Sequence, residues 1–472
     1  MNSVLDKKNF SKAKTNSVDE VSMDISQKIE GEILNSLLQG NQKFIRNLAL
    51  KLHYADLADL LERLSSEERT TLIKALGKDV SPEMLVELDD NVRDEIISVL
   101  AVDDIAGVVS DLDSDDAVDF LEELDEQQQF EILESIPAED RILLRQSLSF
   151  PPDTAGRLMQ REVVTAPEFW NVGHCIDFMR RAADDGDGLL PKVFYDIFVV
   201  DPGNRVVGAI PLSNLLRVQR NVLVTELMET NMTVIPVLLD QEDVAFMFRQ
   251  RDLVSAPVVD EGGRLVGAIT IDDVVDVIQE EHEEDIMRMG GIIADDLYVA
   301  AIGTVRARFS WLVVNLITAI AASLVIHMFD ASIEQMVALA VLMPIIASMG
   351  GNAGTQTLTV TVRALATKEL NQTNAIRLIG KELLVGSFNG ILFALISGVI
   401  AWCWFDNLIL GTVVAAAMIV NMVVAGLAGS AIPIVLNFFK HDPAIASSVF
   451  VTTVTDVVGF FAFLGFAATI LL

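Results

Sequence analysis

One acidic residue near the end of the chain, Asp456, stands inside a strongly apolar stretch, in the run Thr452-Thr453-Val454-Thr455-Asp456. A carboxylate at the centre of a membrane helix costs on the order of 2.5–3.5 kcal/mol, and it tends to persist where it faces water or a cation. The alternative is a protonated carboxyl that is hydrogen-bonded to the neighbouring threonine hydroxyls. We interpret Asp456 as a candidate cation-binding residue in an aqueous passage.

A second group of carboxylates lies in residues 272–291, where acids recur three and four positions apart, as on one face of a helix. The acidic residues of this stretch are Asp272, Asp273, Asp276, Glu280, Glu281, Glu283, Glu284 and Asp285. A solvated helix face is the ordinary interpretation, and a face that binds cations is the other. No cluster of Cys and His residues occurs in the sequence, where His327 and His441 stand alone. Oxygen ligands and a hard ion such as Mg²⁺ are therefore favoured over zinc or copper.

Charge and hydrophobicity are segregated along the 472 residues. The chain carries 34 Lys and Arg against 67 Asp and Glu, a net charge of −33, yet its mean hydropathy is +0.43. Acids and bases are equally numerous after residue 300, so the acidic excess lies before it. Such an acidic portion argues against nucleic acid and anionic lipid surfaces as partners. The two cysteines, Cys175 and Cys403, imply no disulfide framework and are compatible with a reducing cytosol.

Residues 301–472 predict a membrane domain, because apolar stretches of about 20 residues or more follow one another there. We predict five spans, at about 309–329, 333–364, 384–405, 408–439 and 444–472. The basic residues that flank these spans are Arg306, Arg308, Arg363, Lys368, Arg377, Lys381 and Lys440. They fall on one side of the membrane only if the number of spans is five and the N-terminus is cytosolic. We therefore expect a multi-pass protein of the bacterial inner membrane with its C-terminus outside.

Two places in this membrane domain carry residues that interrupt helices. The second span contains Pro344 and then Gly350-Gly351-Asn352. We predict that this run opens the helix and turns backbone groups toward an aqueous cavity, with close helix packing through small residues as the alternative. Asp442 and Pro443, just before the last span, are further gate candidates, although an aspartate there is an equally good N-cap.

The portion before the membrane domain begins with a predicted disordered tail, residues 1–30, followed by a helical repeat domain at 31–155. An apolar anchor recurs every twelve residues at Leu64, Leu76, Leu88, Leu100, Leu112, Leu124, Ile136 and Leu148. Residues of N-cap type follow several anchors, namely Ser65, Asp89, Asp113 and Asp125. Each unit therefore predicts one short helix, and stacked units predict a superhelix. A plain helical bundle is the alternative.

A different repeat pairs residues 201–210 with 260–269, at an offset of 59. Each copy predicts a strand, a glycine-containing turn, another strand and a helix. The pair resembles tandem cystathionine-β-synthase (CBS) domains, which we place at 156–221 and 222–273. In the second copy Thr270 and Asp273 match the nucleotide pattern of such domains, with Thr for a phosphate and Asp for the ribose, so ATP is a candidate ligand. The first copy departs from this pattern, with Pro211 and Asn214 at the matching positions.

Two long runs, Pro344–Ala366 and His441–Phe460, resemble the MgtE family of Mg²⁺ channels, and the order of domains is similar over nearly the whole chain after the tail. The resemblance implies a mainly α protein with a helical N domain, α/β CBS domains, an acidic connecting helix at 274–300 called the plug helix, and five transmembrane helices. It also implies a homodimer with the pore on its two-fold axis. The pore residues would be Asp456 from each subunit, with Asn421, Ala425 and Gly426 as pore-lining positions.

Together these features predict a Mg²⁺-selective channel or transporter that is gated when cytosolic Mg²⁺ binds the acidic N domain, CBS domains and plug helix. Bound Mg²⁺ would favour a compact state over one in which the carboxylates repel each other. An ion-coupled exchanger for Mg²⁺, Mn²⁺ or Co²⁺ is the alternative, and a membrane-tethered nucleotide sensor without transport is another. The sequence contains no nucleophile–base constellation or phosphate loop that would indicate an enzyme.

Overall fold

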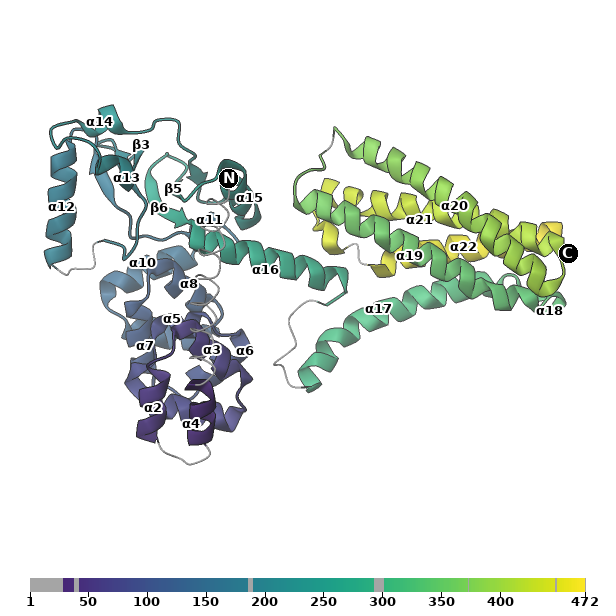
Figure 1. Cartoon of the computed structure of the whole chain (residues 1–472), viewed down its shortest axis with the longest axis horizontal. Helices are drawn as coiled ribbons and strands as arrows, with labels where there is room; N and C mark the ends of the chain where they lie inside the picture. Colours follow the sequence, from purple (N-terminus) through teal and green to yellow (C-terminus); the bar gives the residue numbers. More distant parts are fainter. Residues whose placement is uncertain are drawn as a thin grey trace, which may run out of the picture. The chain divides into compact units, whose positions relative to one another are not determined.

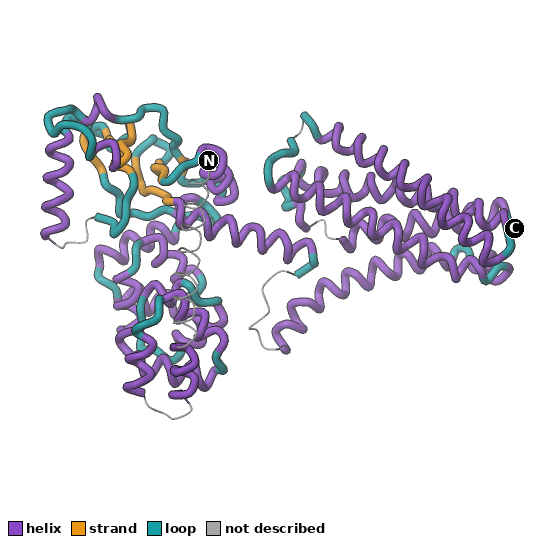
Figure 2. Tube along the Cα trace, in the orientation of Figure 1, coloured by secondary structure: helices purple, strands orange, loops and turns teal. Residues whose placement is uncertain are grey.

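The computed structural model describes residues 29–37, 42–185, 190–292, 301–371, 373–445 and 448–471. The chain forms two compact units, Met1–Ile278 and Gln279–Leu472, which are described separately below. Helices dominate both units, and short strands occur in the first (Figure 2). The prediction of a mainly α protein with a small α/β portion is therefore confirmed. Of the predicted disordered tail, residues 1–28 lie outside the described residues.

The first part of unit one consists of short helices, and from α4 onward one α-helix falls in each twelve-residue repeat. Their bounds are α2 (Gln42–Ala49), α3 (Tyr54–Arg63), α4 (Ser66–Leu76), η1 (Gly77–Asp79), α5 (Pro82–Val86), α6 (Asp90–Ile97), α7 (Val102–Asp111), α8 (Ser114–Glu122), α9 (Glu126–Ser135) and α10 (Ala138–Leu148). Ser65, Asp89, Asp113 and Asp125 all occupy N-cap positions, as the repeat predicts. Asp125 Oδ1, for example, accepts hydrogen bonds from the amides of Gln127 and Gln128 at 2.9 and 2.8 Å.

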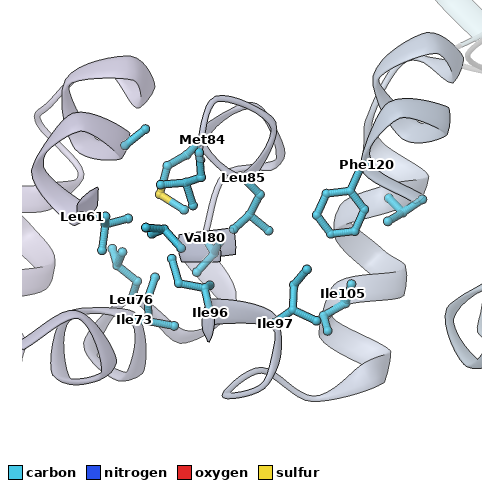
Figure 3. Packing of buried hydrophobic residues seen from close by; sticks show 14 of the residues in the cluster. Leu61, Ile73, Leu76, Val80, Met84, Leu85, Ile96, Ile97, Ile105 and Phe120 are labelled. Carbon is cyan, nitrogen blue, oxygen red and sulfur yellow. The ribbon is translucent and has the colours of Figure 1, made fainter. Parts of the chain in front are cut away.

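The anchors of the repeat form one continuous core with their neighbours. Leu76, Ile96 and Phe120 lie within it, and helices far apart in the sequence contribute side chains to the same cluster (Figure 3). Stacking of this kind is what a short amphipathic helix requires, because it cannot bury its apolar face alone.

The CBS pair follows as two three-stranded sheets with the same topology. The strands are β1 (Thr165–Pro167), β2 (Asp196–Val200) and β3 (Val206–Pro211) in one sheet, and β4 (Ile235–Pro236), β5 (Ser255–Val259) and β6 (Leu265–Thr270) in the other. In each sheet the first two strands are parallel and the last two antiparallel. The helices are α11 (Ala155–Leu158), α12 (Val172–Asp185), α13 (Leu212–Leu215), α14 (Val224–Leu227), α15 (Gln241–Arg251) and α16 (Ile271–Met289). The predicted order of strand, turn, strand and helix is confirmed in both copies.

Helix α16 belongs to both units. Its first two turns are part of the second CBS core, in which Val274 and Val277 are buried, and unit one ends at Ile278. The predicted boundary between 273 and 274 therefore lies too early, because the acidic helix continues the last CBS helix without interruption. Of the predicted plug helix, residues 293–300 lie outside the described residues.

Unit two contains five helices long and apolar enough to cross a membrane, which confirms the predicted number for the described part of the chain. The elements of this unit are α17 (Ala301–His327), α18 (Asp330–Gln335), α19 (Ala338–Ala366), α20 (Ala375–Phe405), α21 (Leu408–Phe438), η2 (Pro443–Ile445) and α22 (Ser448–Ile470). Helices α19 to α22 run alongside one another (Figure 1). Helix α20 begins well before the predicted residue 384, because Arg377, Lys381 and Glu382 interrupt the apolar pattern without interrupting the helix.

The predicted opening of the second span is wrong. Helix α19 is continuous through Pro344 and through Gly350, Gly351 and Asn352, so the helix is not opened at this run. The small residues instead allow neighbouring helices to approach. A Cβ on Gly354 would lie 2.5 Å from Val451 Cγ1 of α22, and one on Gly351 would lie 3.1 Å from Thr452 Cγ2.

Candidate functional site

Asp456 lies near the middle of α22, half-buried within its own chain. The neighbouring threonine hydroxyls do not bind it. Thr452 and Thr453 donate to the carbonyl oxygen of Val449, at 3.1 and 2.6 Å, and Thr455 donates to the carbonyl oxygen of Thr452 at 2.9 Å. Among the described residues no hydrogen bond or ion pair involves the Asp456 carboxylate. The alternative of a carboxyl held by threonine hydroxyls is therefore not what the structure contains.

The helix face beside Asp456 is fixed by close contacts with α19 and α21. Thr455 is fully buried, and Gly459 approaches the side chain of Asn421. Asp456 follows Thr455 directly and so stands at the flank of this contact, with its side chain half-buried. The arrangement presents one unpartnered carboxylate on a rigid helix.

The pore-lining role of Asn421, Ala425 and Gly426, on a two-fold axis between two copies, stays a prediction. All three are buried in helix contacts of α21. The Asn421 amide Nδ2 donates to the carbonyl oxygen of Ile346 at 2.7 Å, and its Oδ1 is buried with no partner among the described residues. A Cβ on Gly350 would lie 2.2 Å from Asn421 Nδ2. The amide thus fills a slot between α19, α21 and α22.

Asp442 confirms its N-cap interpretation and has a second partner. Its Oδ1 accepts a hydrogen bond from the amide of Ala444 at 2.7 Å, at the start of η2 and beside Pro443. Its other oxygen pairs with Arg288 of α16, which also pairs with Glu284. The end of α16 is therefore attached to the loop that leads into the helix of Asp456.

The same end of α16 is held by apolar packing and carries a perturbed carboxyl. Met289 packs against Leu358, Val451 and their neighbours. Burial, followed by the charges of Asp442 and Glu281, raises the pKa of Asp285 to about 6. Glu280, Glu281, Glu284 and Asp285, predicted as sensor residues, thus belong to the part of α16 that lies in the membrane unit.

The other predicted sensor residues, Asp272, Asp273 and Asp276, lie in unit one and face carboxylates of the helical domain. Burial, and then the charge of Asp273, raises the pKa of Asp116 to about 7 and raises that of Asp115 as well. Burial also raises the pKa of Asp273, to about 6. Helix α8 and the start of α16 therefore place like charges against one another, which destabilises this contact when all of them are ionised.

The carboxylates of α8 are functional candidates that the sequence analysis missed, because Asp113 and its neighbours were interpreted only as the cap of a repeat unit. Asp115, Asp116 and Asp119 are the additional members. In the part of the chain that the structure describes, no three His, Cys, Asp or Glu side chains converge closely enough to hold a metal ion. The geometry is that of two opposed acidic faces and not of a finished coordination shell.

Comparison with known proteins covers nearly all of these elements. The family model described as a divalent cation transporter, MgtE, matches residues 343–466, the MgtE intracellular N domain matches 52–153, and the CBS domain matches 155–221 and 224–280. The magnesium transporter MgtE of Thermus thermophilus is 35% identical over 323 residues, which are 68% of this chain and 70% of that protein. This chain belongs to the MgtE family.

A second MgtE relative, the magnesium transporter MgtE of Bacillus subtilis, is 31% identical over 325 residues, again 68% of this chain and 70% of the relative. The crystal structure of the cytosolic domain of the Mg²⁺ channel MgtE in complex with ATP is 29% identical, with a TM-score of 0.49, and covers 52% of this chain and 99% of that one. Family membership and the five apolar helices together make the chain a multi-pass membrane protein.

The nucleotide site of this MgtE-family chain stays a prediction. Thr270 Oγ1 donates to Asp273 Oδ2 at 2.8 Å, so the two residues suggested for phosphate and ribose bind one another at the start of α16. Asp273 also faces Asp115 of α8. In this structure the Asp273 carboxylate therefore accepts a hydrogen bond at the start of α16 and lies opposite the carboxylate of Asp115.

Proposed function

We propose that this chain is a Mg²⁺ channel that works as a homodimer, with Asp456 from each copy facing a hydrated ion at the two-fold axis. The observation that carries the proposal is the half-buried Asp456 carboxylate, which has no hydrogen-bond or ion-pair partner among the described residues and lies on a helix fixed by close packing in an MgtE-family bundle. Mg²⁺ sheds its water reluctantly and prefers oxygen ligands, so a pair of carboxylates that contact a hydrated ion suits it. Arg363 at the end of α19, and Arg377 and Lys381 near the start of α20, support a cytosolic N-terminus and an external C-terminus.

Reconstituted protein should take up Mg²⁺ down its own gradient, without a proton or Na⁺ gradient across the vesicle. The reason is that a channel needs no coupled ion, whereas an exchanger does. Uptake of Mg²⁺, Mn²⁺ and Co²⁺ into proteoliposomes, measured with and without each gradient, checks both transport and selectivity. Strict dependence on one gradient would contradict the channel and identify the coupled exchanger.

We further propose that cytosolic Mg²⁺ gates the channel through the two acidic regions of α16. In unit one Asp273 and Asp276 face the carboxylates of α8, and in unit two Asp285 lies beside Asp442. Bound cations would cancel the repulsion in both places and favour a compact state. Because α16 is one unbroken helix with its end attached at Arg288 and Met289, a shift of its first part would reach the membrane unit.

Trypsin should cleave unit one of the detergent-solubilised chain faster in EDTA than in millimolar Mg²⁺. The physical reason is the opposition of ionised carboxylates on α8 and α16, which a bound cation or added protons would relieve. Time courses of cleavage followed by mass spectrometry measure the difference. Equal rates in the two buffers would contradict the gate.

Protons should partly replace Mg²⁺ in that assay. A carboxyl whose pKa is raised by folding binds its proton more tightly in the folded state, so the stability of the contact falls as pH rises toward about 7. Cleavage in EDTA should therefore be slower at pH 6 than at pH 8. The variant Asp115→Asn with Asp116→Asn should be protected in EDTA, whereas Glu139→Gln with Asp140→Asn, two exposed acids in the first turn of α10, should behave as the wild type.

A further inference from the structure

Glu382 is a second carboxylate inside the membrane bundle, on α20, and only 7% of it is exposed. Its Oε2 accepts a hydrogen bond from Thr357 Oγ1 of α19 at 3.2 Å. The ammonium of Lys381 lies 3.8 Å from the other carboxylate oxygen, but two thirds of that lysine side chain is exposed. An ion pair of this kind contributes little, so the threonine hydroxyl is the specific partner of Glu382.

Two glycines of α21 allow this contact to form across the helix. A Cβ on Gly426 would lie 2.7 Å from the carbonyl oxygen of Glu382, and one on Gly429 would lie 2.9 Å from Thr357 Cβ. At the two positions of α21 that lie against Glu382 and Thr357, the chain therefore has glycine, which leaves room for both residues. A glutamate near a helix end could instead extend its carboxylate to the aqueous interface. The hydrogen bond from Thr357 is what holds the Glu382 carboxylate in its buried position.

One turn of α19 connects the contact between Glu382 and Thr357 with α22, the helix that carries Asp456. Gly354 lies three residues before Thr357 and so on the same face. A Cβ on Gly354 would lie 2.5 Å from Val451 Cγ1 and 3.7 Å from Thr455 Cγ2, which precedes Asp456 in α22. A displacement of this turn of α19 would therefore move the surface that contacts Val451 and Thr455 of α22, and Asp456 directly follows Thr455.

We infer that Glu382 and Thr357 form a positioning pair, which links α20 to α19 and, through the contact of α19 with α22, sets the place of the Asp456 carboxylate. The inference rests on the proposed function of Asp456. It assigns to Glu382 the role of a hydrogen-bond acceptor and not that of a second ion-binding or proton-carrying group.

The test uses Mg²⁺ uptake by reconstituted full-length variants, with flux expressed per folded molecule as measured by size-exclusion chromatography. Glu382→Met and Thr357→Val keep side-chain size but remove the hydrogen bond, and each should raise the apparent KM for Mg²⁺ by about tenfold, as expected for a bond to a charged group. Glu382→Gln and Thr357→Ser retain an acceptor and a hydroxyl and should stay within about twofold of the wild type. The double variant Glu382→Met with Thr357→Val should be no worse than either single variant, because one bond is lost in all three.

The outcomes separate this inference from the proposed function. An unchanged KM in Glu382→Met or Thr357→Val, at normal uptake by the wild type, overturns the positioning pair alone. Loss of folded yield with an unchanged KM would show a merely structural contact and also overturns it. If Glu382→Gln raises the apparent KM as much as Glu382→Met does, the charge of Glu382 itself acts on the ion. That result contradicts the positioning pair. Absence of Mg²⁺ uptake by the wild type overturns the channel and this inference with it.

Discussion

Asp456→Ala should lower Mg²⁺ uptake to the level of empty liposomes while folded protein is recovered at wild-type yield. The two parts of this result have one cause. Among the described residues the Asp456 carboxylate makes no hydrogen bond or ion pair, so its removal breaks no internal contact. On the function proposed above, the cost of a carboxylate in a membrane helix is offset by water and by the transported cation. Uptake into proteoliposomes, together with size-exclusion profiles in detergent, measures both parts.

Two further variants make the result specific. Asp456→Asn keeps the shape of the side chain and removes its charge, and it should be as inactive as the alanine variant. Asp406→Asn is the matched control, because this acid lies between α20 and α21 at a φ of +50°, a conformation that asparagine accepts. Its uptake should be unchanged. Normal uptake by Asp456→Ala would remove Asp456 from the ion pathway.

The second large effect concerns the backbone contact between α19 and α21. A Cβ on Gly429 would lie 2.5 Å from the carbonyl oxygen of Gly354 and 3.1 Å from the amide nitrogen of Leu358. These are backbone atoms of a continuous helix and cannot rotate away, so Gly429→Ala must push the two helices apart. Overpacking of this kind costs about 1–3 kcal/mol and sometimes more. We expect a lower melting temperature in detergent and a strong loss of folded protein.

Gly465→Ala and Gly380→Ala are the matched controls for this variant. Each lies in a long membrane helix, and a Cβ at either position would meet nothing within 4 Å. Alanine is the better helix former by roughly 1 kcal/mol, so these variants should melt at or above the temperature of the wild type. Melting curves from fluorescence-detected size exclusion compare the three variants directly. Equal melting of Gly429→Ala and its controls would contradict the close approach.

Much of the architecture follows from local sequence patterns. The twelve-residue repeat predicts short capped helices because Ser65, Asp89 and their equivalents satisfy the free amides at helix starts, whatever the rest of the chain does. The two CBS copies are predictable for a similar reason, since strand, turn and helix signals recur at one offset. The five membrane helices follow from length and hydropathy alone.

The predictions that depend on neighbours fared differently. The run at Gly350 predicts an opened helix, yet in the structure α19 is continuous and this glycine makes room for the side-chain amide of Asn421. Polarity inside an apolar helix indicates only that a partner must exist. Which helix supplies that partner is decided by packing between residues 71 positions apart, and no local pattern contains that information.

The acidic residues show the same division. The sequence alone determined that α16 has an acidic face and that Asp456 is a carboxylate in apolar surroundings, because both depend on spacing and residue type. The tertiary structure decided that α8 faces the start of α16, that Arg288 attaches its end to Asp442, and that Glu382 turns inward to Thr357. The physical reason is that the sequence gives the sign of each charge, whereas its burial and its partners depend on segments that are distant in the sequence and become neighbours only in the folded chain.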